Sequence, residues 1–313
     1  MVEFDSEMVV RFQDIRSPVS YLSKVYGFDG LLNFYRNGKR TETSVTYLRE
    51  GKTMDDLRKA IRAKGLELTE RKAGVTVRIS EECYICEMID ELLSIKGVFI
   101  EIPVIVKEGD IILRLKYFNE YSAQIQRVIF KDADKRDYFS LDYLGKVRSD
   151  GEWLLENVKS VEMRKLVFYV IPQNSFTLGI TKKTKDLKVD VATRYVDISG
   201  FLEVFYEVEG DATEWERTLE KVAPEFLKIK RPSSANKVFF ARIPEQGILI
   251  DPYKTTDLDL PFSYELEMKG DRAKVSMVFE KNTLDSFFKS ISRVKPEEFE
   301  ASELEIKSVE RFP

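Results

Sequence analysis

The two cysteines of the sequence stand close together, as Cys83 and Cys86 in the stretch CYIC. A C-x-x-C pair is typical of a thiol redox centre or of half of a metal site. The residues from 83 to 95 predict a helix, and positions i and i+3 of a helix lie on one side. Burial of two small apolar side chains would produce the same spacing. Packing, redox chemistry and metal binding therefore stay open, and packing is the interpretation we favour.

A zinc ion at this cysteine pair would need further ligands, because structural zinc usually has about four. The sequence contains no other cysteine and no histidine. Two chains of a homodimer could share their thiolates across an interface, or nearby carboxylates could complete the set: Glu81, Glu82 and Glu87. Glu82 and Glu87 oppose a redox role, because nearby negative charge disfavours the reactive thiolate.

The absence of histidine excludes several kinds of active site. A Ser-His-Asp or Cys-His site cannot be made within this chain, and neither can a histidine metal site. The glycine patterns of dinucleotide-binding and P-loop proteins are missing as well. Acid–base catalysis would depend on Asp, Glu, Lys, Tyr or Cys with shifted pKa values. We predict no catalytic residue, and an enzyme built from carboxylates and lysines is the least favoured hypothesis.

The charge of the chain does not favour a dedicated nucleic-acid-binding protein. Its net charge is −4, from 50 Lys and Arg against 54 Asp and Glu, whereas phosphate contacts need a basic surplus. The best local candidate is Phe240 with Lys237 and Arg242, because an exposed ring beside basic side chains can stack on a base. The alternation around Phe240 equally predicts a buried strand. Nucleic-acid binding through a basic sheet face is therefore the alternative hypothesis.

The elements that carry these residues follow a similar order twice along the chain. The stretches EGDIILRLKYF and KGDRAKVSMVFE each predict a hairpin, turning at Gly109-Asp110 and at Gly270-Asp271. Strands are predicted at 8–12 and again at 164–171. Amphipathic helices are predicted at 53–65 and again at 211–222. This order indicates a duplicated unit.

The duplication predicts an α+β fold of two tandem, distantly similar modules. Each should have an antiparallel sheet with helices on one face, ferredoxin-like or related. We place the first module at 1–150 and the second at 163–313, joined by a linker helix at 151–162. The turn residues from Arg148 to Gly151 mark the start of this linker.

The second copy also resembles a known family. The stretches MRKLVFYVIPQNSFTLGITKK, FLEVFYEVEGDATEWERTLEKV and GDRAKVSMVFEKNTLDSFFKSI resemble the sensor-type N-terminal domain of archaeal bacterio-opsin-activator-like regulators. The family's His/Cys/Trp cluster is replaced here by the residues 173–176, QNSF. The family's helix-turn-helix would follow Val309, and the sequence ends at Pro313. The resemblance therefore implies a duplicated sensor domain without direct DNA binding.

These observations lead to one functional expectation. We expect a cytoplasmic, non-enzymatic regulatory or sensor protein that binds a small molecule or a partner protein, with homodimer formation as one arrangement. The first residues, MVEFDSEM, do not resemble a signal peptide. No stretch approaches the roughly 20 apolar residues of a membrane span. No cofactor is expected apart from the zinc hypothesis for Cys83 and Cys86.

Overall fold

The computed structural model describes most of the 313-residue chain. The described residues are 2–13, 18–27, 30–37, 40–48, 54–63, 67–70, 74–79, 84–101, 104–131, 138–144, 163–170, 176–184, 186–197, 201–231, 234–244, 263–280 and 301–308. The chain divides into two compact units. The N-terminal module is Phe4–Val161, and the C-terminal module combines Glu162–Pro313 with Met1–Glu3.

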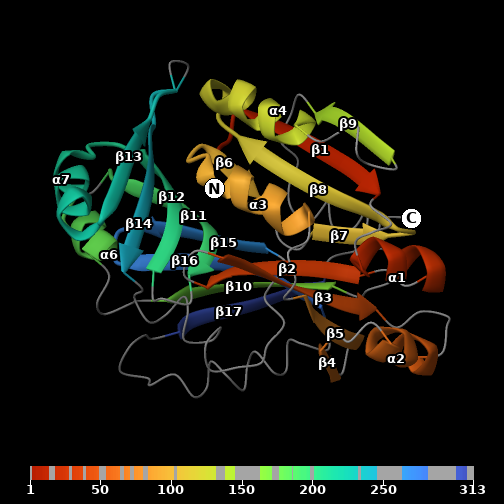
Figure 1. Ribbon diagram of the computed structural model, residues 1–313. Helices are drawn as coiled ribbons and strands as arrows, with labels where there is room; N and C mark the ends of the chain where they lie inside the picture. The colour runs from red at the N-terminus through yellow and green to blue at the C-terminus, as the bar shows by residue number, and fades with distance from the viewer. Residues whose placement is uncertain are drawn as a thin grey trace. The chain divides into compact units, whose positions relative to one another are not determined.

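The strands of the N-terminal module form an antiparallel sheet (Figure 1). They are β1 (Ser6–Gln13), β2 (Gly30–Asn37), β3 (Arg40–Leu48), β4 (Glu67–Glu70), β5 (Gly74–Ile79), β6 (Val98–Ile100), β7 (Val104–Lys107), β8 (Asp110–Tyr117) and β9 (Tyr138–Leu144). The pairings give the order β9-β1-β8-β7-β2-β3-β5-β4, with β6 also paired to the end of β8.

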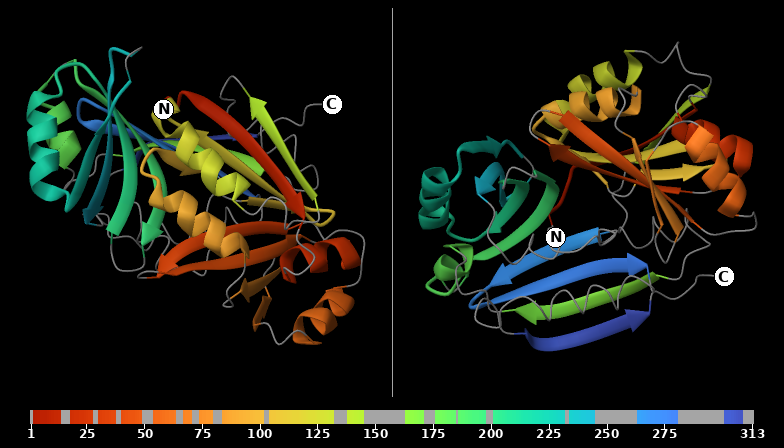
Figure 2. Two further views of the ribbon diagram at one scale, coloured as in Figure 1. Left: turned by 45° about the horizontal axis from the view of Figure 1, so that its top comes forward. Right: turned by 60° about the horizontal axis from the view of Figure 1, so that its bottom comes forward.

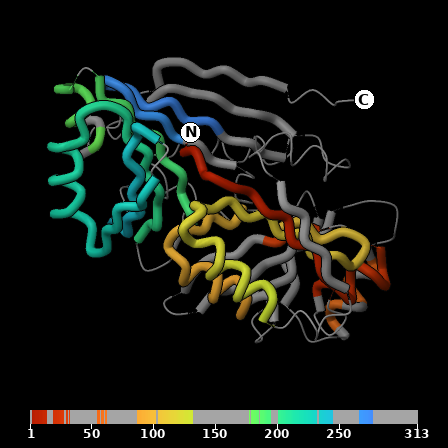
Figure 3. The backbone as a smooth tube through the Cα atoms, turned by 90° about the horizontal axis from the view of Figure 1, so that it is seen from above, coloured from red at the N-terminus to blue at the C-terminus, as the bar shows by residue number. Residues whose placement is uncertain are grey.

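The helices of this module are amphipathic and bury their apolar sides. They are α1 (Pro18–Tyr26), α2 (Met54–Ala63), α3 (Tyr84–Ser94) and α4 (Ser122–Phe130), the last preceded by a 3₁₀ turn, η1 (Asn119–Tyr121). Figure 3 shows α3 and α4 side by side. Ile89 and Leu92 of α3 and Ile125 and Ile129 of α4 are fully buried.

The C-terminal module has a sheet of the same design. Its strands are β10 (Met163–Val170), β11 (Lys188–Asp197), β12 (Phe201–Glu209), β13 (Glu225–Ile229), β14 (Lys237–Pro244), β15 (Ser263–Lys269), β16 (Arg272–Glu280) and β17 (Ala301–Ser308). Their order is β17-β10-β16-β15-β11-β12-β14-β13, all antiparallel. The right-hand view of Figure 2 shows β17, β10, β16 and β15 as neighbours.

Two helices, α6 (Phe176–Thr181) and α7 (Thr213–Val222), cover one face of this sheet. Alternate residues of β12 face α7, because successive side chains of a strand point to opposite sides. Leu202, Val204, Tyr206 and Val208 thereby join Trp215 in a buried apolar core. The intervening residues Glu203, Phe205 and Glu207 lie on the other face of the strand.

The two modules match strand for strand in this order, so the predicted α+β class with two antiparallel sheet modules is confirmed. The ferredoxin-like detail is not confirmed. The predicted linker helix at 151–162 lies outside the described residues. None of the helices in the described part of the chain is long and apolar enough to cross a membrane.

Candidate functional site

The helix α3 (Tyr84–Ser94) corresponds to the helix that the sequence predicts at 83–95. Cys86 lies within this helix, as the sequence predicts, while Cys83 lies outside the described residues. Among the residues that the structure describes, no group of three or more His, Cys, Asp or Glu could hold a metal ion. Packing, redox chemistry and zinc binding at this pair remain predictions.

The three residues of the stacking hypothesis do not form an exposed platform. Phe240 is fully buried, and its ring packs edge-on against Phe205 at 5.7 Å between centroids. Lys237 lies on the opposite face of β14 and pairs with Glu216 of α7 at 3.3 Å. The strand alternation that favoured a buried strand therefore accounts for Phe240, whose ring has no face open to a base.

Arg242 lies two residues beyond Phe240, on the same face of β14. Its guanidinium stacks over the ring of Phe201 at 4.2 Å from the centroid, a cation–π contact. On that face a second guanidinium, from Arg194, lies 5.7 Å from the Phe240 centroid. These arginines contact aromatic rings of their own module, and nucleic-acid binding by the chain stays a prediction.

A buried cluster of charges lies on the sheet of the N-terminal module. Arg114 of β8 donates through Nη2 to Oε2 of Glu7 on β1, at 2.8 Å. Its Nη1 is 2.7 Å from Oε2 of Glu101, which follows β6. Lys116 of β8 is 3.4 Å from the same Glu101 oxygen. All four side chains are at most about 5% exposed, so one guanidinium joins two carboxylates away from solvent.

The register of the strands explains how this cluster forms. Val9 pairs with Arg114 and Glu7 pairs with Lys116, so these residues share one face of the β1–β8 pair. The other face carries Met8, Val10 and Phe12, which are fully buried apolar residues. Charged residues thus occupy one side of strands whose other side is the apolar core.

The C-terminal module has two buried ion pairs on β12, on the face away from α7. Arg194 of β11 is 3.2 Å from Oε2 of Glu203. Glu207 lies four residues further along β12, and its Oε1 is 3.2 Å from Nη1 of Arg231. Arg231 lies two residues after the end of β13. Glu203 and Glu207 are each only 3% exposed. The module therefore repeats the arrangement of buried carboxylate and guanidinium with different residues.

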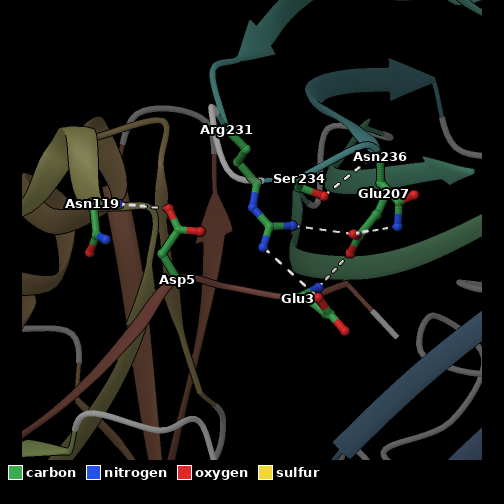
Figure 4. A network of polar contacts seen from close by, with 7 residues as sticks. All are labelled: Glu3, Asp5, Asn119, Glu207, Arg231, Ser234 and Asn236. Atoms are coloured by element: carbon green, nitrogen blue, oxygen red, sulfur yellow. Dashed lines mark hydrogen bonds and ion pairs between the residues drawn. The ribbon is translucent and has the colours of Figure 1, made fainter.

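Glu207 is the centre of a group of polar contacts in this module (Figure 4). Its Oε1 accepts hydrogen bonds from Arg231 and from Nδ2 of Asn236, at 3.2 and 3.0 Å. Its Oε2 accepts the backbone N–H of Glu3 at 2.6 Å. Ser234 Oγ accepts the N–H of Asn236 at 3.1 Å and shapes the turn before β14. We call Glu207, Arg231 and Asn236 the Glu207 site.

The chain leaves this site directly after Glu3. Asp5 donates its N–H to the carbonyl of Tyr117 at 3.1 Å. Its carboxylate accepts the N–H of Asn119 at 3.0 Å, the second contact drawn in Figure 4. The Phe4 ring packs on Phe99 and Phe118, with centroids 5.4 and 5.0 Å apart. Phe4 and Asp5 are therefore bound within the N-terminal module, and the residues before them within the C-terminal module.

A common chemistry unites these groups. Five carboxylates are buried among the described residues, and each lies in an ion pair: Glu7, Glu101, Asp190, Glu203 and Glu207. The pair at Asp190 shows the electrostatic effect. Burial alone would lower the pKa of Lys188, but Asp190 and Glu267 outweigh it, and the pKa of Lys188 is raised. Ion pairing of this kind favours the ionised form of Lys188.

The fold and these clusters define an α+β protein of two antiparallel sheet modules, each with ion-paired carboxylates buried on its sheet. A family model described as the Ta1207 family matches residues 8–232. Because this match spans more than half of the chain, the protein belongs to the Ta1207 family. Comparison with curated proteins gives no match.

Proposed function

We propose that this chain is a cytoplasmic, non-enzymatic regulatory protein that binds a small molecule or a partner protein. The resemblance to the sensor domain of archaeal bacterio-opsin-activator-like regulators supports a role in transcription control, exerted through a partner chain or a homodimer. The matching strand orders of the two modules support the duplication on which that resemblance depends.

One observation carries the proposal over the enzyme hypothesis. Among the residues that the structure describes, each of the five buried carboxylates is held in an ion pair with an arginine or a lysine. A general acid or base needs a pKa near the working pH, which comes from burial without a neutralising partner. In an ion pair, the guanidinium occupies the carboxylate that a substrate would have to reach. This arrangement suits recognition and structural specificity better than proton transfer.

The arginines of these pairs define the ligand chemistry to test. A guanidinium presents several N–H groups in a planar fork and binds carboxylates and phosphates through paired hydrogen bonds. Arg231 is the most accessible of the buried-pair arginines, with 9% of its side chain exposed, against 1% for Arg114. Small anionic metabolites and acidic protein segments are therefore the first classes to test.

A thermal-unfolding screen tests the proposal. We expect at least one anionic metabolite to raise the unfolding temperature, with a stabilisation of about 2.7 kcal/mol when its concentration is about 100 times the Kd. The same protein should not consume the ligand when the mixture is followed by mass spectrometry. Turnover of a compound from the panel would contradict the proposal. Binding of nucleic acid with a steep salt dependence would favour the alternative instead.

A further inference from the structure

The first residues of the chain are bound by the C-terminal module in the manner of a short peptide. The side chain of Val2 is buried, with 3% exposed. The backbone N–H of Glu3 donates to Glu207 at 2.6 Å. The Glu3 carboxylate, 75% exposed, points toward Nη2 of Arg231 at 3.9 Å. Figure 4 shows the main-chain hydrogen bond and the charge contact of Glu3. The buried side chain of Val2 precedes them in the same segment.

The protein side of this contact is built from residues that hold one another in place. Glu207 is 3% exposed, and its other oxygen is occupied by Arg231 and Asn236. The turn that carries Asn236 is fixed by the hydrogen bond from its own N–H to Ser234. These contacts orient Oε2 of Glu207, the oxygen that accepts the Glu3 N–H, before the segment binds. A preorganised acceptor loses less conformational entropy on binding.

We propose that the Glu207 site is a peptide-binding site, and that residues 2–3 of this chain are its resident occupant. It would take an extended segment with an apolar side chain followed by an acidic one, recognised by Glu207 through a main-chain N–H. A partner protein carrying such a segment would compete with the chain's own. This inference rests on the proposed function and deepens it, because it names the kind of partner segment that the Glu207 site would bind.

The resident segment has an advantage over any competitor. Because it is covalently attached, its effective concentration at the site is on the order of millimolar. Release would free only residues 2–3, because Phe4 and Asp5 have their own contacts in the N-terminal module. A competing segment would therefore displace residues 2–3 and leave β1 of the N-terminal module in place.

The test uses a variant of the full chain that lacks residues 1–3 and a fluorescent peptide, Met-Val-Glu-Gly-Ser, with the dye on its C-terminal side. We expect saturable binding by fluorescence anisotropy, at least about tenfold tighter than to the intact chain, in which the site is occupied. Glu207→Gln in the shortened chain should weaken binding about tenfold or more, because an ionised acceptor is lost.

Glu203→Gln is the matched control, since Glu203 lies on the same strand with equal burial and its own arginine partner, Arg194. It should change binding less than about twofold. Hydrogen exchange of the Glu3 amide in the intact chain gives a second readout, faster in Glu207→Gln than in Glu203→Gln. Equal effects of the two variants, or no peptide binding by a folded shortened chain, would overturn the inference. If small anions still raise the unfolding temperature in that case, the proposed function is kept and only the peptide-binding inference is rejected.

Discussion

Tyr206 shows how one residue can link the core of the C-terminal module to pH. It lies on the face of β12 that packs against α7, with its ring edge-on to Trp215 at 4.9 Å. Complete burial raises the pKa of Tyr206 far above its usual value, because the phenolate would have to ionise away from water. Burial, helped by Glu120, likewise raises the pKa of Tyr121 to about 12.

Tyr206→Phe should therefore flatten the alkaline limb of the stability curve. Below about pH 10, tyrosine is protonated in both folded and unfolded chains, and pH has no effect through this residue. Above about pH 10 only the unfolded chain loses the proton, so the folded state becomes less favoured by up to about 1.4 kcal/mol per pH unit. Urea unfolding from pH 9 to pH 11.5 should show this extra slope in the wild type and not in the variant.

The difference in alkaline slope between the wild type and Tyr206→Phe tests this prediction. Parallel curves for wild type and Tyr206→Phe would mean that Tyr206 ionises as easily in the folded chain as in water. Tyr121→Phe should reduce the slope in the same sense, and only between about pH 10 and its raised pKa of about 12.

The sequence predicts single strands better than it predicts their charged partners. The stretch around Arg114 reads as a strand because apolar residues surround a charge, and that charge in an apolar strand is the only local signal of the cluster. Its partner Glu7 is 107 residues away, so strand order has to be known before the pair can be inferred. The burial of the Phe240 ring was hard to predict for a related reason, since alternation alone does not say which face of a strand is covered.

At the scale of elements, turns and amphipathic helices were the most predictable parts. Gly109 and Gly270 both have positive φ, as the two predicted hairpin turns require. The predicted helix at 211–222 is α7, and the Asp211 carboxylate accepts the Thr213 N–H at its start, at 3.0 Å. Two strands were not predicted, β9 and β13. Both are edge strands, and β13 has a single buried residue, Ile229, so it lacks a buried alternation to reveal it.

The connection from β12 to α7 depends on a glycine whose surroundings allow a matched comparison. Gly210 has φ +97°, and a Cβ there would lie 2.4 Å from the carbonyl oxygen of Asp186. Gly270 also has positive φ, +62°, but a Cβ there would have nothing within 4 Å. Gly270→Ala should cost about 1–2 kcal/mol through backbone strain alone. Gly210→Ala should cost more, because backbone atoms must move as well.

Urea unfolding of the two variants checks this order. Both glycines belong to the C-terminal module, so the same unfolding transition reports on each. Equal losses would show that backbone conformation alone sets the cost and that the Asp186 contact is relieved without strain.

At the scale of the whole molecule, the duplication gives two modules that each have a core of their own. Each also buries charges, and such pairs contribute little net stability while both partners are present. Their removal is costly, because one substitution leaves the other charges buried and uncompensated. Our hypothesis is that both modules keep these ion pairs because they specify which strands lie next to each other.

Because each module has its own core, we expect a local substitution to lower the stability of one module only. Arg114→Met would leave Glu7 and Glu101 without the guanidinium that joins them, at a cost of about 3–5 kcal/mol. Lys131→Met is the control, because Lys131 and its partner Glu91 are both half exposed, and such pairs contribute about 1 kcal/mol or less.

In calorimetry Arg114→Met should lower the temperature of one of two unfolding transitions, and Gly210→Ala that of the other. A single transition lowered by both variants would mean that the modules unfold as one unit, because only a strongly coupled interface transmits a local loss to both cores.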